Sequence, residues 1–540
     1  MYTTKIKQYL PIFAAFLVQA LLYSCASVGY PTGGEVDKIP PKPIAFEPKN
    51  ESRDFVADKI LIQFDEYIQL KDVDNQVIIS PPFENKPEIV VKGKAVQISI
   101  KDTLKPNTTY LFQFKNAVVD NNEGNALSSL DYVFSTGKIL DSLSLQGVVV
   151  DALTLKPEEN INVLLYNAAD FTDSTVAKYK PVYLTKTDKK GEFKFKYLTQ
   201  GSYKIIALKD NDKSLTYNNP AEKIAFMADA VEPIYICDSA ATIDTIELKA
   251  FEQNVLQQRI TNSNLKKAGY AVITTSCPMQ NPVVTSDGND LIVYTNKTSD
   301  TLHVWAKKAT DSLSLIVLDN SGINDTLKLR NFGKQKSRKE PFLKTNIKSI
   351  FPYYDTIRVS FTNPVDSVID SEKMMYVKTA TDSFYTHLVF DSLKLNAFVP
   401  LKLIPDSSYQ FIIVGKNIVD IYGNTNDTVV QKTKLNSAKD YGTIKITVVA
   451  TDKPFPYILQ VLNEKGAVVS EKVVGNDVVE FTNLTAGKYT IRAIADDNAN
   501  GKWDAGNYWK SIQSEKVYYM PKTLELRSNW DIEETFELAE

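Results

Sequence analysis

Histidine and cysteine are scarce in this chain of 540 residues, which has two histidines and three cysteines. Few side chains are therefore available for a histidine-based metal centre or for a catalytic triad that uses histidine as its base. Basic clusters are also missing, and the formal net charge is −3. A nucleic-acid-binding protein needs a basic surface to neutralise phosphates, so we expect no nucleic-acid partner.

Tyrosine, phenylalanine and short apolar runs are what the sequence has in quantity. It contains 28 tyrosines and 25 phenylalanines, and 43% of its residues are hydrophobic. Such a chain can bury ordinary cores, and at roughly 150 residues per domain its length predicts three or four domains.

The first 25 residues have the order of an export signal. Lys5 and Lys7 precede an apolar stretch over residues 9–22, which is too short to span a bilayer comfortably. The stretch ends in Leu22-Tyr23-Ser24-Cys25, which resembles the lipobox of bacterial lipoprotein signal peptides. The resemblance implies that residues 1–24 are removed and that Cys25 carries acyl chains, so that membrane lipid is a partner. An ordinary secreted protein with an incidental cysteine is the alternative.

Residues 25–42 are rich in glycine and proline and are expected to form a tether between the lipidated cysteine and the first domain. Ala26 does not resemble the Asp that retains some lipoproteins in the inner membrane. We therefore expect an outer-membrane protein with a lipid anchor, and leave open whether it faces the periplasm or the cell surface.

Short alternating segments predict β-strands throughout. They include 59–64, 88–100, 109–114 and 131–136, and turn residues separate them at the spacing found in sandwiches. Because no long stretch shows helical periodicity, the fold class is predicted as all-β, in tandem β-sandwiches.

Two units of the chain each occur twice. Leu104–Tyr110 recurs as Leu403–Tyr409, and Phe195–Tyr203 recurs as Phe481–Tyr489. The order is thus A, B, a connecting segment, A′, B′. Unit A resembles the SbsA-type bacterial Ig-like domain through its early Ile-x-Ile-x-Phe-Asp-Glu, its LKPNTTY and VVDNNEGN motifs and its closing FSTG. Unit B resembles the carboxypeptidase-regulatory-like, or prealbumin-like, sandwich, and Lys189-Lys190-Gly191 predicts a hairpin turn in it.

These repeats define the predicted domains. After the signal peptide (1–24) and the tether (25–42) come module A (43–137), module B (138–250), a β domain of unknown family (251–340), module A′ (341–436) and module B′ (437–540). Module A′ lacks the FSTG motif and is predicted as a degenerate Ig-like domain. The whole chain resembles Bacteroidota Ig-like-domain lipoproteins of uncharacterised function.

One loop of module B′ has the spacing of a calcium site. Asp496, Asn498 and Asn500 offer oxygens at loop positions one, three and five, Gly501 stands at position six and Asp504 at position nine. A solvated turn between two strands is the alternative. In module B the matching segment Asp210–Leu215 lacks the glycine and contains Lys213, so we expect no calcium there. Calcium aside, no cofactor is expected.

The same region offers a second kind of site. Trp503, Tyr508 and Trp509 lie close together in sequence and could stack on a sugar ring, or instead pack under the rim of the sandwich. Cys237 and Cys277 could form a disulfide or be buried separately. Asp-Ser/Thr-aliphatic triplets, such as Asp102–Leu104, resemble the O-glycosylation sequence of exported Bacteroidota proteins, although they equally suit strand starts.

No group of residues in the sequence forms a recognisable catalytic constellation, so we predict that the protein is not an enzyme. The predicted function is that of a lipid-anchored cell-envelope protein with a structural, scaffolding or adhesive role. Envelope proteins or glycans are its expected partners besides lipid. The alternative is a surface module that binds carbohydrate or peptide.

Overall fold

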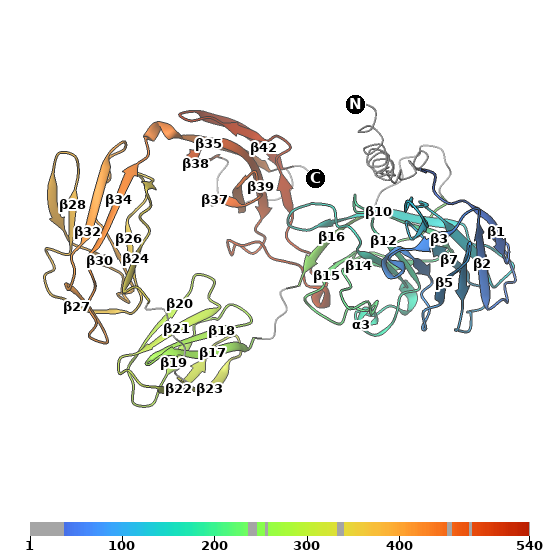
Figure 1. Ribbon diagram of the computed structural model, residues 1–540, viewed down its shortest axis with the longest axis horizontal. Helices are drawn as coiled ribbons and strands as arrows, with labels where there is room; N and C mark the ends of the chain where they lie inside the picture. Colours follow the sequence, from blue (N-terminus) through green and yellow to red (C-terminus); the bar gives the residue numbers. More distant parts are fainter. Residues whose placement is uncertain are drawn as a thin grey trace, which may run out of the picture. The chain divides into compact units, whose positions relative to one another are not determined.

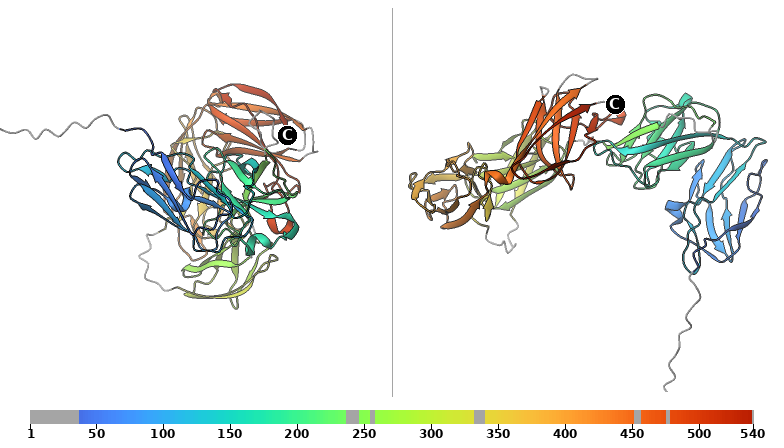
Figure 2. Two further views of the ribbon diagram at one scale, coloured as in Figure 1. Left: turned by 90° about the vertical axis from the view of Figure 1, so that its right-hand side faces the viewer. Right: turned by 90° about the horizontal axis from the view of Figure 1, so that it is seen from above.

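Strands make up nearly all the secondary structure (Figure 1 and Figure 2), which confirms the predicted all-β fold. The computed structural model describes residues 37–235, 246–253, 258–331, 340–450, 456–474 and 478–538, with side chains up to 449 in the fourth range. The signal peptide, most of the tether and Cys25 lie outside these ranges. Within them, no helix is long and apolar enough to cross a membrane. The chain divides into two compact units, Met1–Leu143 with Lys196–Thr199, and the remainder.

Module A forms a sandwich in the first unit. One sheet has the order β1-β2-β6-β5, a second has the order β4-β7-β9, and β3 pairs with β8. Strand β2 shows why the alternating sequence folds this way, since Ile60, Ile62 and Phe64 are fully buried while Lys59 and Gln63 are exposed. The elements are β1 (Pro43–Glu47), β2 (Lys59–Phe64), β3 (Ile68–Leu70), α2 (Val73–Gln76), β4 (Ile78–Ser80), β5 (Glu88–Lys92), β6 (Ala95–Ser99), β7 (Thr109–Gln113), β8 (Val118–Asp120) and β9 (Asp131–Ser135).

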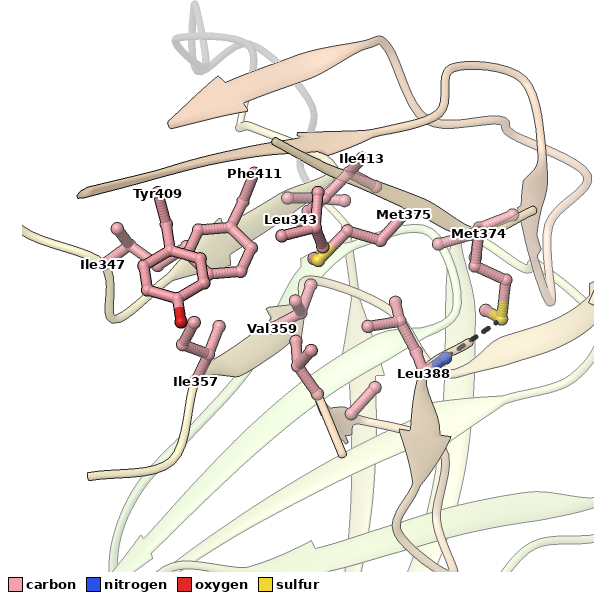
Figure 3. Close-up of a cluster of buried hydrophobic side chains, with 14 of the residues drawn as sticks. Leu343, Ile347, Ile357, Val359, Met374, Met375, Leu388, Tyr409, Phe411 and Ile413 are labelled. Atoms are coloured by element: carbon pink, nitrogen blue, oxygen red, sulfur yellow. Dashed lines mark hydrogen bonds between the residues drawn. The ribbon is translucent and has the colours of Figure 1, made fainter. Parts of the chain in front are cut away.

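Module A′, in the second unit, repeats this strand order. Its sheets run β24-β26-β31-β30 and β25-β34-β32-β28-β29, and β27 pairs with β33. Val359, Met375 and Phe411 lie in its apolar core (Figure 3). The strands are β24 (Leu343–Thr345), β25 (Ile350–Phe351), β26 (Arg358–Phe361), β27 (Val365–Val368), β28 (Met375–Lys378), β29 (Ser383–Thr386), β30 (Val389–Phe390), β31 (Asn396–Phe398), β32 (Ser408–Ile413), β33 (Ile418–Asp420) and β34 (Val429–Leu435).

The repeated motifs of A and A′ form the same local contacts. The Tyr110 hydroxyl accepts a hydrogen bond from the backbone N–H of Lys105 at 3.0 Å, and the Tyr409 hydroxyl accepts one from Ile404 at 3.2 Å. In both modules, the tyrosine therefore ties the start of a central strand to the loop before it.

Module B has one seven-stranded path in the order β12-β11-β14-β15-β16-β10-β13, and β10 and β16 run parallel. The predicted turn at Lys189–Gly191 forms, but the hairpin prediction was wrong. Strands β12 and β13, which flank the turn, stand at opposite ends of the path, so the turn carries the chain from one part of the sheet to another. The elements are β10 (Leu143–Asp151), β11 (Asn162–Asn167), a 3-10 turn at Ala168–Asp170, α3 (Thr175–Lys178), β12 (Tyr183–Lys186), β13 (Glu192–Leu198), β14 (Tyr203–Leu208), β15 (Lys223–Phe226) and β16 (Ile246–Glu252).

Module B′ repeats the pairing of module B in two sheets, β38-β35-β42 and β37-β36-β39-β40, with β41 also paired to β39. Its single parallel pair, β35 and β42, corresponds to β10 and β16. The elements are a 3-10 turn at Ala438–Asp440, β35 (Tyr441–Ala450), β36 (Tyr457–Asn463), β37 (Val468–Val474), β38 (Val478–Thr485), β39 (Gly487–Ala495), η3 (Tyr508–Lys510), β40 (Val517–Tyr519), β41 (Leu524–Leu526) and β42 (Asp531–Leu538).

The connecting segment is a small sandwich with its own core. Its sheets run β17-β18-β21-β20 and β19-β22-β23, and Ile273, Val304 and Leu315 are fully buried between them. The strands are β17 (Ile260–Lys267), β18 (Tyr270–Thr275), β19 (Val283–Thr285), β20 (Leu291–Thr295), β21 (Thr301–Ala306), β22 (Ser312–Leu318) and β23 (Asn324–Arg330).

Candidate functional site

The loop that follows β39 in module B′ is organised by Asp496. This carboxylate is only 2% exposed. Its Oδ1 accepts a hydrogen bond from the N–H of Asn500 at 2.9 Å, and its Oδ2 accepts one from Gly501 at 2.8 Å. Gly501 has a φ of 73°, a conformation that glycine adopts without strain. The loop therefore has the tight bend that the calcium-type spacing predicts.

The other predicted calcium ligands lie together around the same bend. Asn498 and Asn500 both direct their side-chain amides to Oδ2 of Asp504, the second at 2.7 Å. In this arrangement their N–H groups, rather than their carbonyl oxygens, face the carboxylate. Their oxygens accept hydrogen bonds from the backbone N–H groups of Asn500 and Lys502, so rotation of either amide by half a turn would present oxygen but lose that hydrogen bond.

Glu515 completes this loop, and sequence reasoning missed it. It is 7% exposed, and its two oxygens accept hydrogen bonds from the N–H groups of Asp497 and Asp504, each at 2.9 Å. Burial is the main cause that raises the pKa of Glu515. Glu515 lies beyond the span of the loop motif, so no spacing rule could have selected it. Its two oxygens are already bonded to backbone N–H groups, and calcium at this loop stays a prediction.

The three aromatic residues proposed to stack on a ligand have different environments. Tyr508 is 4% exposed, whereas Trp509 is 42% exposed. Trp503 is partly buried against the cluster of Ile458, Ile494 and Val517, and its Nε1–H donates to the backbone oxygen of Glu515 at 3.2 Å. The structure thus gives Tyr508 and Trp503 the packing role that was the alternative interpretation, and it leaves Trp509 the accessible ring.

Residues 503–509 of module B′, the aromatic loop, pack on module B within the second unit. The Tyr508 ring lies 5.8 Å from the Tyr217 ring and 5.4 Å from the Phe226 ring, both edge to face. Its hydroxyl donates to the backbone oxygen of Asp173 at 3.1 Å. Gly506 approaches module B so closely that a Cβ there would lie 2.4 Å from the Phe251 ring. No sequence signal indicated this contact, because its two sides are far apart along the chain.

The contact between modules B and B′ also contains hydrogen bonds. The side-chain amide of Gln513 donates to the backbone oxygen of Phe226 at 2.9 Å. The hydroxyl of Tyr519 donates to the backbone oxygen of Leu153 at 3.3 Å. The contact therefore joins apolar burial with directional bonds, which gives it a defined register.

The cysteine pairing stays open. Cys277 is half-buried in the connecting segment, and its N–H donates to Oε1 of Gln258 at 3.1 Å. Cys237 lies outside the described residues.

His303 is held in a row of aromatic rings on the connecting segment. Its Nδ1 lies 2.7 Å from the hydroxyl of Tyr270, and its ring stacks with those of Tyr270 and Trp305. Burial lowers the pKa of His303. These contacts hold His303 on one face of β21.

Comparisons with known proteins identify two parts of the chain. Residues 37–136 match the bacterial Ig-like domain family, which confirms module A as Ig-like. Residues 434–511 match a family described as "Uncharacterized protein conserved in bacteria (DUF2141)". No curated protein matches the sequence.

Solved structures with a similar fold are remote. The Bacillus anthracis TIE protein is 13% identical, with 94% of this chain and 76% of that chain covered and a TM-score of 0.14. BcpA, the major pilin subunit of Bacillus cereus, is 10% identical, with 74% and 99% covered and a TM-score of 0.15. SGBP-B of Bacteroides ovatus, solved with a mixed-linkage heptasaccharide, is 9% identical, with 81% and 98% covered and a TM-score of 0.19. At these TM-scores the likenesses carry no functional argument.

Proposed function

We propose that the protein is a non-catalytic, lipid-anchored component of the bacterial cell envelope, in which tandem β-sandwiches act as a scaffold or in adhesion. The observation that carries the proposal is the series of separately cored sandwiches, of which module A matches the bacterial Ig-like family. Sandwiches of this kind suit such work because their sheets stay rigid while their loops vary.

The sequence at the N-terminus supports the anchored location. The order of basic residues, apolar stretch and Leu22-Tyr23-Ser24-Cys25 is that of a lipobox, and several acyl chains on Cys25 would hold the chain on a membrane, at about 0.8 kcal/mol per buried methylene. We place the protein at the outer membrane, where membrane lipid and envelope proteins or glycans are its partners.

Metabolic labelling with a fatty-acid analogue in the native bacterium tests the anchor. The wild-type chain should take up the label and fractionate with the outer membrane, whereas Cys25→Ala should do neither. Wild-type chain found unlabelled in the soluble fraction would refute the anchored location. Protease treatment of intact cells then decides between surface and periplasm, since only a surface-exposed chain is cleaved.

One observation favours carbohydrate or peptide binding as a second candidate. A cleft of about 670 Å³ lies between modules B and B′, and Tyr518, Tyr519, Lys516 and Glu247 are among its lining residues. A volume of this size is within the range of small-molecule sites. Glycan and peptide arrays, with Trp509→Ala and Tyr518→Ala as variants, test it. A ligand whose binding is lost in either variant supports this function. An array without hits would favour the scaffold function instead.

A further inference from the structure

Three carboxylates converge in module B at the loop where sequence reasoning expected no metal. One oxygen each from Asp210, Asp212 and Glu222 lies within 4.8 Å of the others. Asp210 and Asp212 follow β14, and Glu222 directly precedes β15, so the two ends of one loop bring the three acids together. Like charges at this spacing repel one another unless a cation or a shared proton lies between them.

Glu222 has an oxygen that nothing in the described chain satisfies. The residue is 1% exposed. Its Oε1 accepts a hydrogen bond from the N–H of Asn211 at 2.8 Å, but its Oε2 is buried and has no hydrogen-bond partner. A buried, unpaired carboxylate oxygen is costly, and a metal ion is one of the few groups that would compensate for it.

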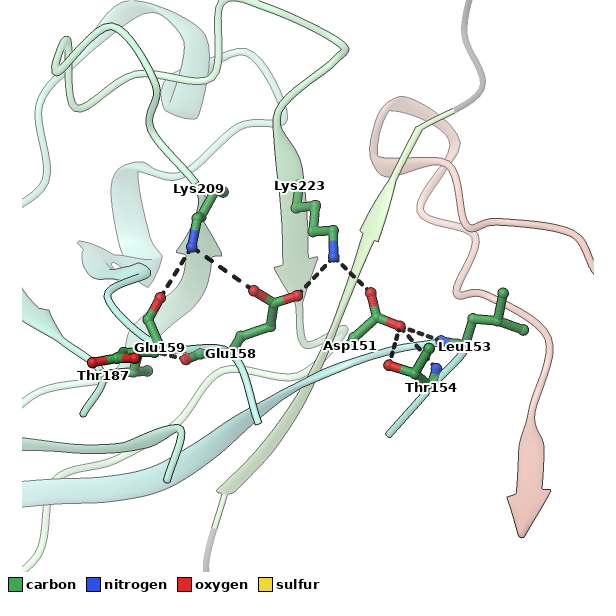
Figure 4. Close-up of polar contacts among 8 residues, drawn as sticks. All are labelled: Asp151, Leu153, Thr154, Glu158, Glu159, Thr187, Lys209 and Lys223. Atoms are coloured by element: carbon green, nitrogen blue, oxygen red, sulfur yellow. Dashed lines mark hydrogen bonds and ion pairs between the residues drawn. The ribbon is translucent and has the colours of Figure 1, made fainter. Parts of the chain in front are cut away.

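Two of the lysines next to these acids, Lys209 and Lys223, are engaged elsewhere (Figure 4). Lys223, adjacent to Glu222, pairs with Asp151 at 2.6 Å and with Glu158 at 2.7 Å. Lys209, adjacent to Asp210, donates to the backbone oxygen of Glu159 at 3.0 Å. Neighbouring residues of an extended chain point to opposite sides, which separates these lysines from the acids. Within the described ranges, the ion pairs of Lys209 and Lys223 are with Asp151 and Glu158, not with the three acids.

The three acids have pKa values shifted in different directions. Burial is the largest cause that raises the pKa of Glu222. Repulsion from Asp210 and Asp212 also raises it. Burial is also the main cause that raises the pKa of Asp210. Hydrogen bonds from the side chains of Asn218 and Ser214 lower the pKa of Asp212 to about 2, so this carboxylate is charged at neutral pH.

The backbone of this loop matches the calcium-type loop of module B′. The Asp210 carboxylate accepts from the N–H groups of Ser214 and Leu215, as Asp496 does at the corresponding positions. Leu215 has a φ of 59° where Gly501 has 73°. The bend therefore forms without the glycine, because Leu215 adopts the left-handed conformation there.

The two loops differ at the buried glutamate. In module B′, both oxygens of Glu515 accept backbone N–H groups, from Asp497 and Asp504. In module B, only the first of these donors has a counterpart, Asn211, which leaves Glu222 Oε2 without a partner. The loop of module B is therefore the one of the pair that has an open carboxylate oxygen.

We propose that Asp210, Asp212 and Glu222 bind a single calcium ion in module B. Calcium takes six to eight oxygen ligands in flexible geometry, and three carboxylates with water completing the shell on the exposed Asp212 side satisfy it. The ion neutralises the cluster, gives Glu222 Oε2 a partner and fixes the loop. The loop also holds Tyr217, which contacts Tyr508, so calcium stabilises the contact between modules B and B′.

Isothermal titration of the purified mature chain with calcium chloride tests the proposal. Affinities of extracellular calcium modules lead us to expect a Kd of about 10⁻⁴ to 10⁻³ M. Glu222→Gln should weaken binding at this site at least about tenfold, because it removes an anionic ligand. Asp496→Asn is the matched control, since it alters the corresponding loop of module B′ and should leave the module B site intact. Magnesium chloride should bind more weakly.

The following results would support or overturn calcium binding in module B. If both loops bind, Glu222→Gln should lower the stoichiometry from two to one. No heat of binding in the wild type, or unchanged binding in Glu222→Gln, would overturn the proposal. Terbium luminescence excited through tyrosine, with Tyr217 as the nearby donor, gives a second measurement, and Glu222→Gln should weaken the part of it that comes from the module B site. Thermal melting without calcium checks that this variant folds, and we expect it to melt no lower than the wild type, because the substitution relieves repulsion.

Discussion

Asp120 and Asp420 show how a single buried carboxylate shapes a loop in each Ig-like module. Asp120 accepts hydrogen bonds from four consecutive backbone N–H groups, those of residues 122–125, at 2.6–3.0 Å. Asp420 accepts from Tyr422 and Asn424 in the same way. Burial acts to raise the pKa of Asp120, but the backbone donors outweigh it and lower the pKa to about 2.

The stability of module A should therefore depend on pH through Asp120. Its folded-state pKa lies below the ordinary value of 3.8, so the stabilisation is fully present above that value and is lost as pH falls through about 2. Asp120→Asn should lower the calorimetric melting temperature near neutral pH, and the difference from wild type should shrink on acidification. Glu88→Gln, at an exposed ion pair, is the control and should show little difference. A difference that persists unchanged in acid would contradict this account.

At the scale of elements, the alternating pattern predicted most strands because one face of each is buried. Residues 59–64 form β2 and residues 109–113 form β7, close to the segments expected. What sequence could not predict were contacts that join distant elements. Glu222 and Glu515 lie outside the loop motifs that they complete, and the burial of Tyr508 depends on a module far away in sequence. Spacing rules act locally, whereas these residues are placed by the fold.

Two glycines should be irreplaceable at the parallel strand pairs. A Cβ at Gly147 would lie 2.3 Å from the backbone oxygen of Ile246, and one at Gly442 would lie 2.3 Å from that of Trp530. Backbone atoms cannot move aside cheaply, so Gly147→Ala and Gly442→Ala should each destabilise by about 1–3 kcal/mol in urea unfolding. At Gly487, the nearest atom is 3.9 Å away, and Gly487→Ala should cost less. Equal effects at all three positions would show that crowding is not the cause.

The contact between modules B and B′ should depend on Tyr508 in the aromatic loop. Tyr508→Ala removes a buried ring and should destabilise the contact by about 3–5 kcal/mol if the site does not collapse. Tyr508→Phe keeps the ring and loses only the bond to Asp173, which should cost about 0.5–1.5 kcal/mol. Hydrogen exchange of β15 and of loop 209–222 should accelerate in the alanine variant alone. Unchanged protection there would mean that the two modules do not depend on one another.

At the scale of the whole molecule, duplication explains how the chain reached its length. Modules A and A′ have the same strand order, and modules B and B′ share one parallel pair and one loop geometry. The copies have since diverged at single positions, such as the glycine replaced by Leu215. The sequence therefore predicted the repeated architecture and the missing glycine, while the open oxygen of Glu222 became visible only in the structure.

We propose that a lipidated Cys25 holds this series of sandwiches to a membrane. Mass spectrometry of the N-terminal peptide, taken from the membrane fraction of the native bacterium, tests it most directly. If Cys25 is the anchor, we expect a mature chain that begins at Cys25 and carries a diacylglycerol on its thiol. A mature chain that begins elsewhere, or that begins at Cys25 with no lipid, would contradict it.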